Sequence, residues 1–182
     1  LGFTLDASGA TVSYSYTTSF TYDTKGRLIQ IDGPLSGSND LTNYTYWSST
    51  DVFKDGYLKE TKRKKDTTNY LVTTLDGYDY WGNATSQQDP DTTFTCRTFD
   101  TARGVLTEER VAMASQTSCG SINSSDLRSF FTYDPWLRLT KTQNPYGDCV
   151  HREYDSLGRL AAVKERDDCN PESNGDTIEY SY

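Results

Sequence analysis

The chain has 182 residues and a formal net charge of −8, and only 34% of its residues are hydrophobic. Fourteen residues are tyrosine, one is methionine, and no apolar run approaches the about 20 residues that a membrane-spanning helix needs. These values argue against a helical bundle, a general nucleic-acid binder and a membrane span. They favour β-strands, because aromatic and β-branched side chains suit a pleated, half-buried surface.

Six short segments predict β-hairpins in which an aromatic residue and an aspartate precede the turn. A leucine follows the turn in five of them, and Ala84 takes its place in the third. The first runs from Tyr22 and Asp23 through Gly26 to Leu28, and Tyr154, Asp155 and Gly158 begin the same pattern again. An isolated hairpin is marginally stable, so neighbouring hairpins are expected to bury one another's tyrosine and leucine faces. We therefore predict one all-β segment over 1–182, with motifs at 22–28, 53–58, 78–84, 99–106, 133–139 and 154–160.

The turns have specific chemistry. Aspartate is favoured at the first position of a type I β-turn and glycine at the fourth, and a following bulge is common in hairpins. The spacing is met by Asp23 with Gly26, by Asp79 with Gly82 and by Asp155 with Gly158, whereas Asp100 and Gly104 imply one extra residue.

Two of the turns are expected to depart from this pattern. After Asp134 and Pro135, the glycine position is occupied by Leu137, so either that turn differs or it is strained. The pair Asp55–Gly56 instead suits a two-residue type I′ turn.

The two ends of the chain carry a second match. Thr11–Tyr16 returns as Thr177–Tyr182, which predicts the opening strand of another repeat. A strand left with an unpaired edge invites pairing with another chain. We expect this edge to continue into adjacent repeats of a larger protein or to stack with copies of itself.

Four cysteines bracket two of the hairpins. Cys96 and Cys119 lie before and after the hairpin at 99–106, and Cys149 and Cys169 bracket the hairpin at 154–160. Cysteines at the open ends of one hairpin can approach closely enough to bridge. We predict disulfides Cys96–Cys119 and Cys149–Cys169 among three possible connectivities, with four reduced thiols as the alternative.

The tandem Tyr-Asp-x-x-Gly-Arg-Leu motif, complete at 22–28 and 154–160, resembles the YD repeat of the Rhs family. That family includes bacterial polymorphic toxins, C components of insecticidal toxin complexes, and teneurins. The resemblance implies a strip of β-hairpins that spirals into a hollow shell, which commonly encloses a toxic polypeptide. It also implies that the YD residues shape the shell and are not catalytic.

Few residues suggest a catalytic, metal-binding or ligand-binding role. His151 is the only histidine, and a strand residue is the simpler interpretation, so we expect no catalytic residue, no metal site and no cofactor. The acidic loop around Asp167 and Asp168 leaves a Ca²⁺ site as an alternative. Trp81 and Trp136 occupy middle turn positions, so they either stack on a ligand or pack onto the next hairpin tip.

The leading functional hypothesis is a structural segment of a shell in a larger secreted or cell-surface protein that encloses a polypeptide cargo. The expected partners are adjacent repeats or copies of the chain, with an enclosed toxin or a surface glycan as further candidates. The alternative is an adhesion or carbohydrate-binding module that uses tyrosine and tryptophan at the hairpin tips. We do not expect an enzyme.

Overall fold

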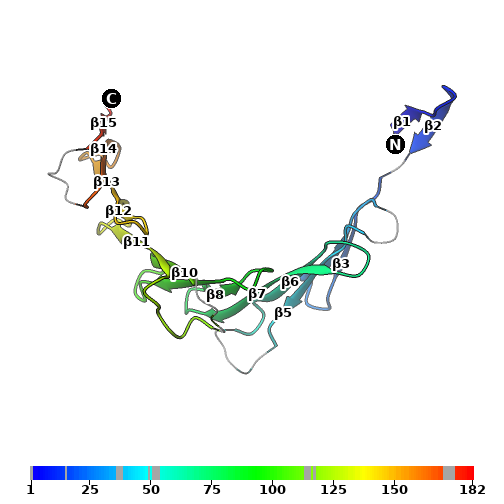
Figure 1. Ribbon diagram of the computed structural model, residues 1–182, viewed down its shortest axis with the longest axis horizontal. Coiled ribbons are helices and arrows are strands. Elements are labelled where there is room, and N and C mark those ends of the chain that lie inside the picture. The colour runs from blue at the N-terminus through cyan, green and yellow to red at the C-terminus, as the bar shows by residue number, and fades with distance from the viewer. Residues whose placement is uncertain are drawn as a thin grey trace. The chain divides into compact units, whose positions relative to one another are not determined.

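The computed structural model describes residues 2–14, 16–35, 39–48, 50, 54–112, 116, 118–169 and 175–182. These residues form β-strands and turns and contain no helix, so the predicted all-β fold of antiparallel hairpins is confirmed (Figure 1). In particular, the described segments include no helix of the length and apolarity that would cross a membrane.

The chain divides into two compact units, Leu1–Leu75 and Asp76–Tyr182. The first unit contains a separate hairpin of β1 (Gly2–Leu5) and β2 (Thr11–Tyr14). It also contains a sheet whose strands are hydrogen-bonded in sequence order: β3 (Ser19–Tyr22), β4 (Leu28–Asp32), β5 (Thr42–Tyr46), β6 (Leu58–Lys64) and most of β7 (Tyr70–Tyr78).

The second unit begins in the last residues of β7 and follows the same rule, with each strand antiparallel to the next. Its further strands are β8 (Ala84–Gln88), β9 (Phe94–Phe99), β10 (Leu106–Ala112), β11 (Leu127–Tyr133), β12 (Leu139–Gln143), β13 (Cys149–Tyr154), β14 (Leu160–Arg166) and β15 (Thr177–Glu179). Because sequential strands pair throughout the sheet from β3 to β15, every connection within it is a hairpin or a loop between neighbours.

The motif residues set the register of the hairpins. Tyr22 lies opposite Leu28, and Tyr154 lies opposite Leu160, so the tyrosine and the leucine of one repeat are cross-strand partners. The same pairing joins Phe99 to Leu106 and Tyr133 to Leu139. In each of these hairpins the register shifts next to the pair, as expected for a turn that is followed by a bulge.

The second hairpin differs from the prediction. Tyr46, and not Phe53, lies opposite Leu58, while the Trp47 carbonyl accepts the Gly56 amide at 2.9 Å. Trp47 therefore occupies the aspartate position, and a longer loop separates it from Gly56. Phe53 lies outside the described residues, and Asp55 lacks the positive φ that a type I′ turn requires.

Tight turns that the sequence analysis did not predict also lie at the strand ends away from the motif turns. Between β12 and β13, the Asn144 amide donates to the Asp148 carbonyl at 2.9 Å, and Gly147 donates back to Asn144. Related turns join β6 to β7 at 66–69 and β8 to β9 at 89–93, and Asp6 to Ala10 closes the β1–β2 hairpin in the same way.

Burial among the described side chains is shallow, and the buried ones lie in one unit. Among the described residues, the buried apolar side chains are Cys96, Ala112, Cys149 and Ala162, and the buried polar ones are Thr95, Arg110, Asp126 and Arg166. All eight belong to the second unit. The low hydrophobic content of the sequence thus corresponds to a thin sheet without a deep core.

Candidate functional site at the hairpin tips

Each regular tip is built around one aspartate, which organises the turn with its backbone and its side chain. The Asp23 amide donates to the Arg27 carbonyl at 2.9 Å, and the Gly26 amide donates to the Asp23 carbonyl at 3.0 Å. The Asp23 carboxylate oxygen Oδ1 accepts the amides of Lys25 and Arg27 at 2.8 and 2.9 Å. Gly26 has a φ of 78°, which a residue with a Cβ adopts only at a cost.

The arginine of the motif also binds the aspartate, through its side chain. Arg27 Nε donates to Asp23 Oδ2 at 2.7 Å, and the equivalent pairs Arg138–Asp134 and Arg159–Asp155 have distances of 2.6 and 2.8 Å. At Asp23 and Asp155 the backbone amide of the arginine is the main cause of a lowered carboxyl pKa, and the guanidinium lowers it further. The aspartates are therefore held as carboxylates, which accept hydrogen bonds without donating.

The same arginine also couples one hairpin to the next. The Tyr154 hydroxyl, on the sixth hairpin, donates to the Leu139 carbonyl of the fifth at 3.0 Å, and the Arg138 guanidinium lies 4.4 Å from the centre of the Tyr154 ring. In the first unit, the Tyr46 hydroxyl likewise donates to the Leu28 carbonyl, and the Arg27 guanidinium lies over the Tyr46 ring. At the end of the chain, the Tyr182 hydroxyl donates to the Leu160 carbonyl, and the Arg159 guanidinium lies over the Tyr182 ring. We call this set of contacts the tyrosine clasp.

At the third tip, the side-chain amide of Asn83 takes the place of the arginine guanidinium found at the first, fifth and sixth tips. Asn83 Nδ2 donates to Asp79 Oδ2 at 3.0 Å and to the Gly104 carbonyl of the next tip at 3.2 Å. At that next tip, Asp100 pairs with Arg103 at 2.7 Å, and the Asp100 amide reaches the Val105 carbonyl. The additional loop residue that the sequence implied is therefore present.

Trp81 packs onto its neighbour. Its indole nitrogen donates to the Thr101 carbonyl at 3.1 Å, and a Cβ on Gly104 would lie 2.7 Å from the Trp81 ring. A Cβ at position 104 would therefore displace the ring, and Trp81 contacts the next hairpin tip.

The tip without a glycine keeps the standard turn. The Leu137 amide donates to the Asp134 carbonyl at 3.0 Å, as a glycine does elsewhere, and Leu137 has a φ of 64°. Of the two outcomes open from the sequence, the structure therefore has the strained leucine.

Both predicted disulfides are present, Cys96–Cys119 and Cys149–Cys169. Each lies beside a buried arginine, because Cys96 pairs in register with Arg110, and Cys149 pairs with Arg166. The guanidinium of Arg110 donates to the Cys119 carbonyl at 2.8 Å.

Arg110 also forms a buried ion pair that the sequence analysis missed. Its Nη1 lies 2.6 Å from Asp126 Oδ2, and the two side chains are 4% and 0% exposed. Gln116 donates to the same carboxylate, and Arg110 reaches the Ser121 carbonyl. The network ties the loop that follows β10 to the sheet. No local sequence pattern predicts this ion pair, because Arg110 and Asp126 are far apart along the chain.

His151 and the acidic loop remain without assigned chemistry. His151 Nε2 lies 3.2 Å from the Cys169 carbonyl, on a strand as expected. Within the described ranges, no group of three or more histidine, cysteine, aspartate or glutamate side chains is placed to hold a metal ion.

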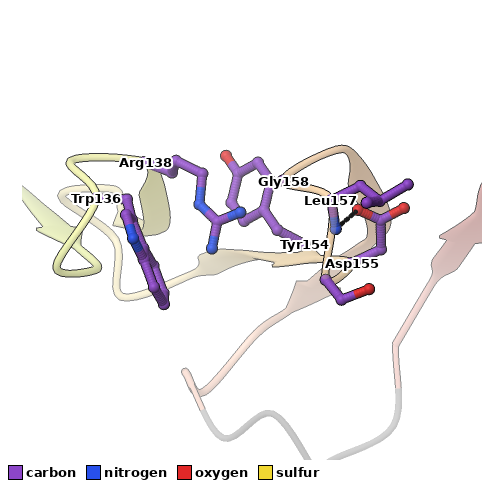
Figure 2. A pocket seen from close by; sticks show the side chains of 7 residues that line it. Trp136, Arg138, Tyr154, Asp155, Leu157 and Gly158 are labelled. Atoms are coloured by element: carbon purple, nitrogen blue, oxygen red, sulfur yellow. Dashed lines mark hydrogen bonds between the residues drawn. The ribbon is translucent and has the colours of Figure 1, made fainter.

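Between the fifth and sixth tips lies an open pocket of about 530 Å³. Figure 2 shows the Arg138 guanidinium projecting between the rings of Trp136 and Tyr154, with Asp155 and Leu157 on the neighbouring turn. A smaller pocket of about 260 Å³ borders Trp81, with Arg97 and Phe99 among its lining residues.

Sequence reasoning identified the aspartates and glycines of the tips but assigned no role to the arginines, and it missed Tyr46. The signal for the arginines was present, because they recur in the motif directly after the glycine position. Tyr46 was hidden by the long loop before Gly56.

The recurring hairpin tips and the tyrosine clasps indicate which protein family this chain resembles. This chain resembles the Rhs/YD-repeat family. No family model matches the sequence, and no curated protein matches it.

Several solved structures are similar to this chain at low identity. A Tc holotoxin pore from Photorhabdus luminescens, with a mutated TccC3, is 14% identical with a TM-score of 0.47, over 90% of this chain and 9% of that one. A complex of TcdB2 with TccC3 is 15% identical with a TM-score of 0.32, over 90% of this chain and 11% of the other. The same complex without the hypervariable C-terminal region is 15% identical with a TM-score of 0.33, over 88% and 11%.

This chain therefore spans about a tenth of the length of the chains it matches. At these TM-scores the likeness carries no argument about activity or partners. The resemblance to the YD-repeat family is carried by the motif and by the turns that the motif forms.

Proposed function

We propose that this chain is a structural segment of an Rhs/YD-repeat shell, within a larger exported protein that encloses a polypeptide cargo. The observation that carries the proposal is the tyrosine clasp, in which the arginine and the leucine carbonyl of one hairpin hold the tyrosine of the next. It occurs at Tyr46, Tyr154 and Tyr182. A contact that repeats from hairpin to hairpin extends a strip, as nearest-neighbour interfaces do in repeat proteins.

The pattern of burial supports a role within a larger assembly. Among the described residues only eight are buried, while many large apolar side chains are exposed, including Leu5, Phe20 and Ile178 at 67%, 54% and 55%. A thin sheet of this kind gains stability when further repeats or a cargo cover its apolar side chains. Adjacent repeats, copies of the chain and an enclosed polypeptide are the partners we propose.

Export is supported by the disulfides. Two bridges, Cys96–Cys119 and Cys149–Cys169, fit a protein that matures in an oxidising compartment. We propose a secreted or cell-surface location.

The chain is proposed to have no catalytic activity of its own. The aspartates of the tips are engaged by backbone amides and arginines, as at Asp23 and Asp155, and His151 is placed against the Cys169 carbonyl. Turnover of a substrate that is lost in His151→Ala would contradict this part of the proposal.

The test is electron microscopy of the native protein that carries this segment, combined with limited proteolysis. We expect a hollow particle with density inside it, and an internal polypeptide that resists protease until denaturant opens the particle. A filled or extended particle, or a polypeptide that is cleaved at the same rate before and after opening, would contradict the shell.

A further inference from the structure

Three motif turns of the second unit carry exposed apolar side chains that the turns themselves do not require. Trp81, Trp136 and Leu157 lie two residues after the aspartate, and each donates its backbone amide to that aspartate's carboxylate. Lys25 makes the same bond at the first tip, so only the amide is needed at this place. Trp136 and Leu157 are nevertheless 75% and 76% exposed, so the reason for their side chains lies outside the turn.

These turns follow one another along the sheet. Each strand of the second unit is antiparallel to the next, so its motif turns all lie at the same ends of the strands. Because neighbouring strands are about 4.8 Å apart, successive motif turns recur about every 10 Å. Figure 2 shows Trp136 and Leu157 on two adjacent turns. The exposed apolar side chains of these turns, which we call the apolar tip row, are Tyr80, Trp81, Trp136, Leu137 and Leu157.

Charge is distributed unequally between the two ends of these strands. At the motif turns, Arg103, Arg138 and Arg159 each pair with the aspartate of their own turn, so three of the four turns carry no net charge. The turns at the other strand ends, 89–93 and 144–148, contain three aspartates and no lysine or arginine, and two more aspartates directly follow β14. Acidic charge therefore gathers away from the apolar tip row.

We propose that the apolar tip row inserts into the surface of a lipid bilayer. Tryptophan and tyrosine are enriched at membrane–water interfaces, because each ring has an apolar body and one group that can hydrogen-bond. Leu157 adds an aliphatic side chain that can enter the boundary between headgroups and acyl chains. Arg138 and Arg159 follow the row closely in sequence, and such side chains lay their stems along apolar surface while the guanidinium stays near water and lipid phosphates.

The geometry favours lipid over a protein partner. A specific protein interface usually buries a continuous surface of about 800 Å² on each partner, whereas these side chains project from separate turns about 10 Å apart. A protein would need a fitted pocket for each side chain, while lipid chains rearrange around each one independently. With the row in the bilayer, the acidic strand ends remain in water, away from anionic headgroups. This inference is independent of the shell, because exposed tips can contact a membrane whether or not the strip encloses a cargo.

The test is flotation of the whole chain with phosphatidylcholine vesicles. We expect reversible binding that is half complete at roughly 1 mM lipid, about tenfold weaker than binding through a single myristoyl chain. Replacing about a third of the lipid by phosphatidylserine should strengthen binding by less than about threefold, because the row carries little net charge. Absence of binding at about 10 mM phosphatidylcholine, or a larger gain from phosphatidylserine, would overturn the proposal.

Tryptophan fluorescence tests which part of the chain enters the lipid. We expect the emission to move to shorter wavelength on binding, and bromine near the headgroup end of the acyl chains to quench it more than bromine at the bilayer centre, because the insertion is shallow. The quenching should fall in Trp136→Ala. Quenching that is unchanged in this variant would place the contact elsewhere and contradict the assignment.

The variants locate the surface. Trp136→Ala and Leu157→Ser are each expected to weaken vesicle binding at least about tenfold, because each removes one inserted apolar side chain. Tyr146→Ser is the matched control and should change binding by less than about twofold, since Tyr146 is an exposed aromatic residue on a turn at the other strand ends. Circular dichroism should show that all three variants keep the fold.

Two outcomes would assign the row to something other than lipid. Equal effects of Trp136→Ala and Tyr146→Ser would mean that the row is not the contact. Sedimentation showing that the wild-type chain is a dimer that Trp136→Ala dissociates, without an effect on vesicle binding, would assign the row to a second copy of the chain. Either result would overturn the proposal.

Discussion

At the scale of single residues, one aspartate determines each tip. Its backbone amide and carbonyl close the loop, and its carboxylate takes up amides that the turn would otherwise leave without a partner, as Asp155 does for Leu157 and Arg159. The arrangement depends only on residues within the turn, so an asparagine can also make it. Asn144 Oδ1 accepts the Tyr146 and Asp148 amides. The aspartate tips add an ion pair with the following arginine.

That ion pair predicts a specific dependence on pH. The pKa of Asp155 is lowered by the Arg159 backbone amide and then by the Arg159 side chain. A lowered carboxyl pKa in the folded state means that the stabilisation is complete above the unfolded pKa of about 4 and is lost as the pH falls through the folded value.

We expect Asp155→Asn to keep the turn but to lose this contribution. The difference in Tm between the wild type and the variant should be largest near neutral pH and should shrink as the pH is lowered from about 5 to about 2. Thermal unfolding followed by circular dichroism measures it. A difference that stays constant across that range would refute the explanation.

Leu137 allows the cost of a positive φ to be measured. Leu137→Gly is expected to stabilise the chain by about 1 kcal/mol, because a non-glycine residue in the left-handed region is strained by about 1–3 kcal/mol and the flexibility of glycine offsets part of the gain. Gly26→Ala is the reciprocal control, since its added Cβ would meet no atom within 4 Å. It should destabilise by about 1 kcal/mol through φ alone. A lower Tm for Leu137→Gly would contradict the strain.

At the scale of elements, the hairpin is the unit and the tyrosine clasp is its connection. Within a hairpin the tyrosine faces the leucine, and between hairpins the hydroxyl of the same tyrosine reaches the leucine carbonyl of the preceding one. One residue thereby contributes to both interfaces. This double use gives a physical reason for the tyrosine of the motif, because phenylalanine would provide only the ring.

Removing the hydroxyl isolates the second contribution. Tyr154→Phe should destabilise the chain by about 1 kcal/mol, which is the usual net contribution of a hydrogen bond in a protein. Tyr146→Phe is the matched control, because Tyr146 is 83% exposed and no described residue bonds to its hydroxyl. It should change the stability by less than about 0.5 kcal/mol. Chemical denaturation compares them, and equal effects would exclude the clasp as a stabilising contact.

At the scale of the whole molecule, stabilisation is distributed unevenly. Both disulfides and all the buried residues among those described belong to the unit Asp76–Tyr182. The bridges span sequence separations of 23 and 20 residues, and each contributes about 3 kcal/mol in the chain-entropy description. The unit Leu1–Leu75 contains no cysteine.

Reduction should therefore act on the two units differently. After treatment with a reductant, amide hydrogen exchange is expected to accelerate in β9, β10, β13 and β14, which carry or adjoin the bridges, and to change much less in β3 to β6. Mass spectrometry of exchanged peptides resolves the two regions. Equal acceleration throughout would mean that the disulfides stabilise the chain as one cooperative body.

The sequence by itself determined the hairpins, most of their turns and the disulfide pairing. These features depend on contacts within a few residues of the turn, such as Asp23 to Gly26, or on cysteines that bracket a single hairpin, so the pattern along the chain contains the necessary information.

Only the tertiary structure decided what lies between hairpins. It placed Tyr46 at the second tip despite a long loop and joined Arg110 to Asp126. It also showed that Trp81 hydrogen-bonds to the next tip, whereas the ring of Trp136 contacts Arg138. The reason is that these contacts depend on how one hairpin lies against the next. Residues with the same place in a turn can therefore meet different neighbours.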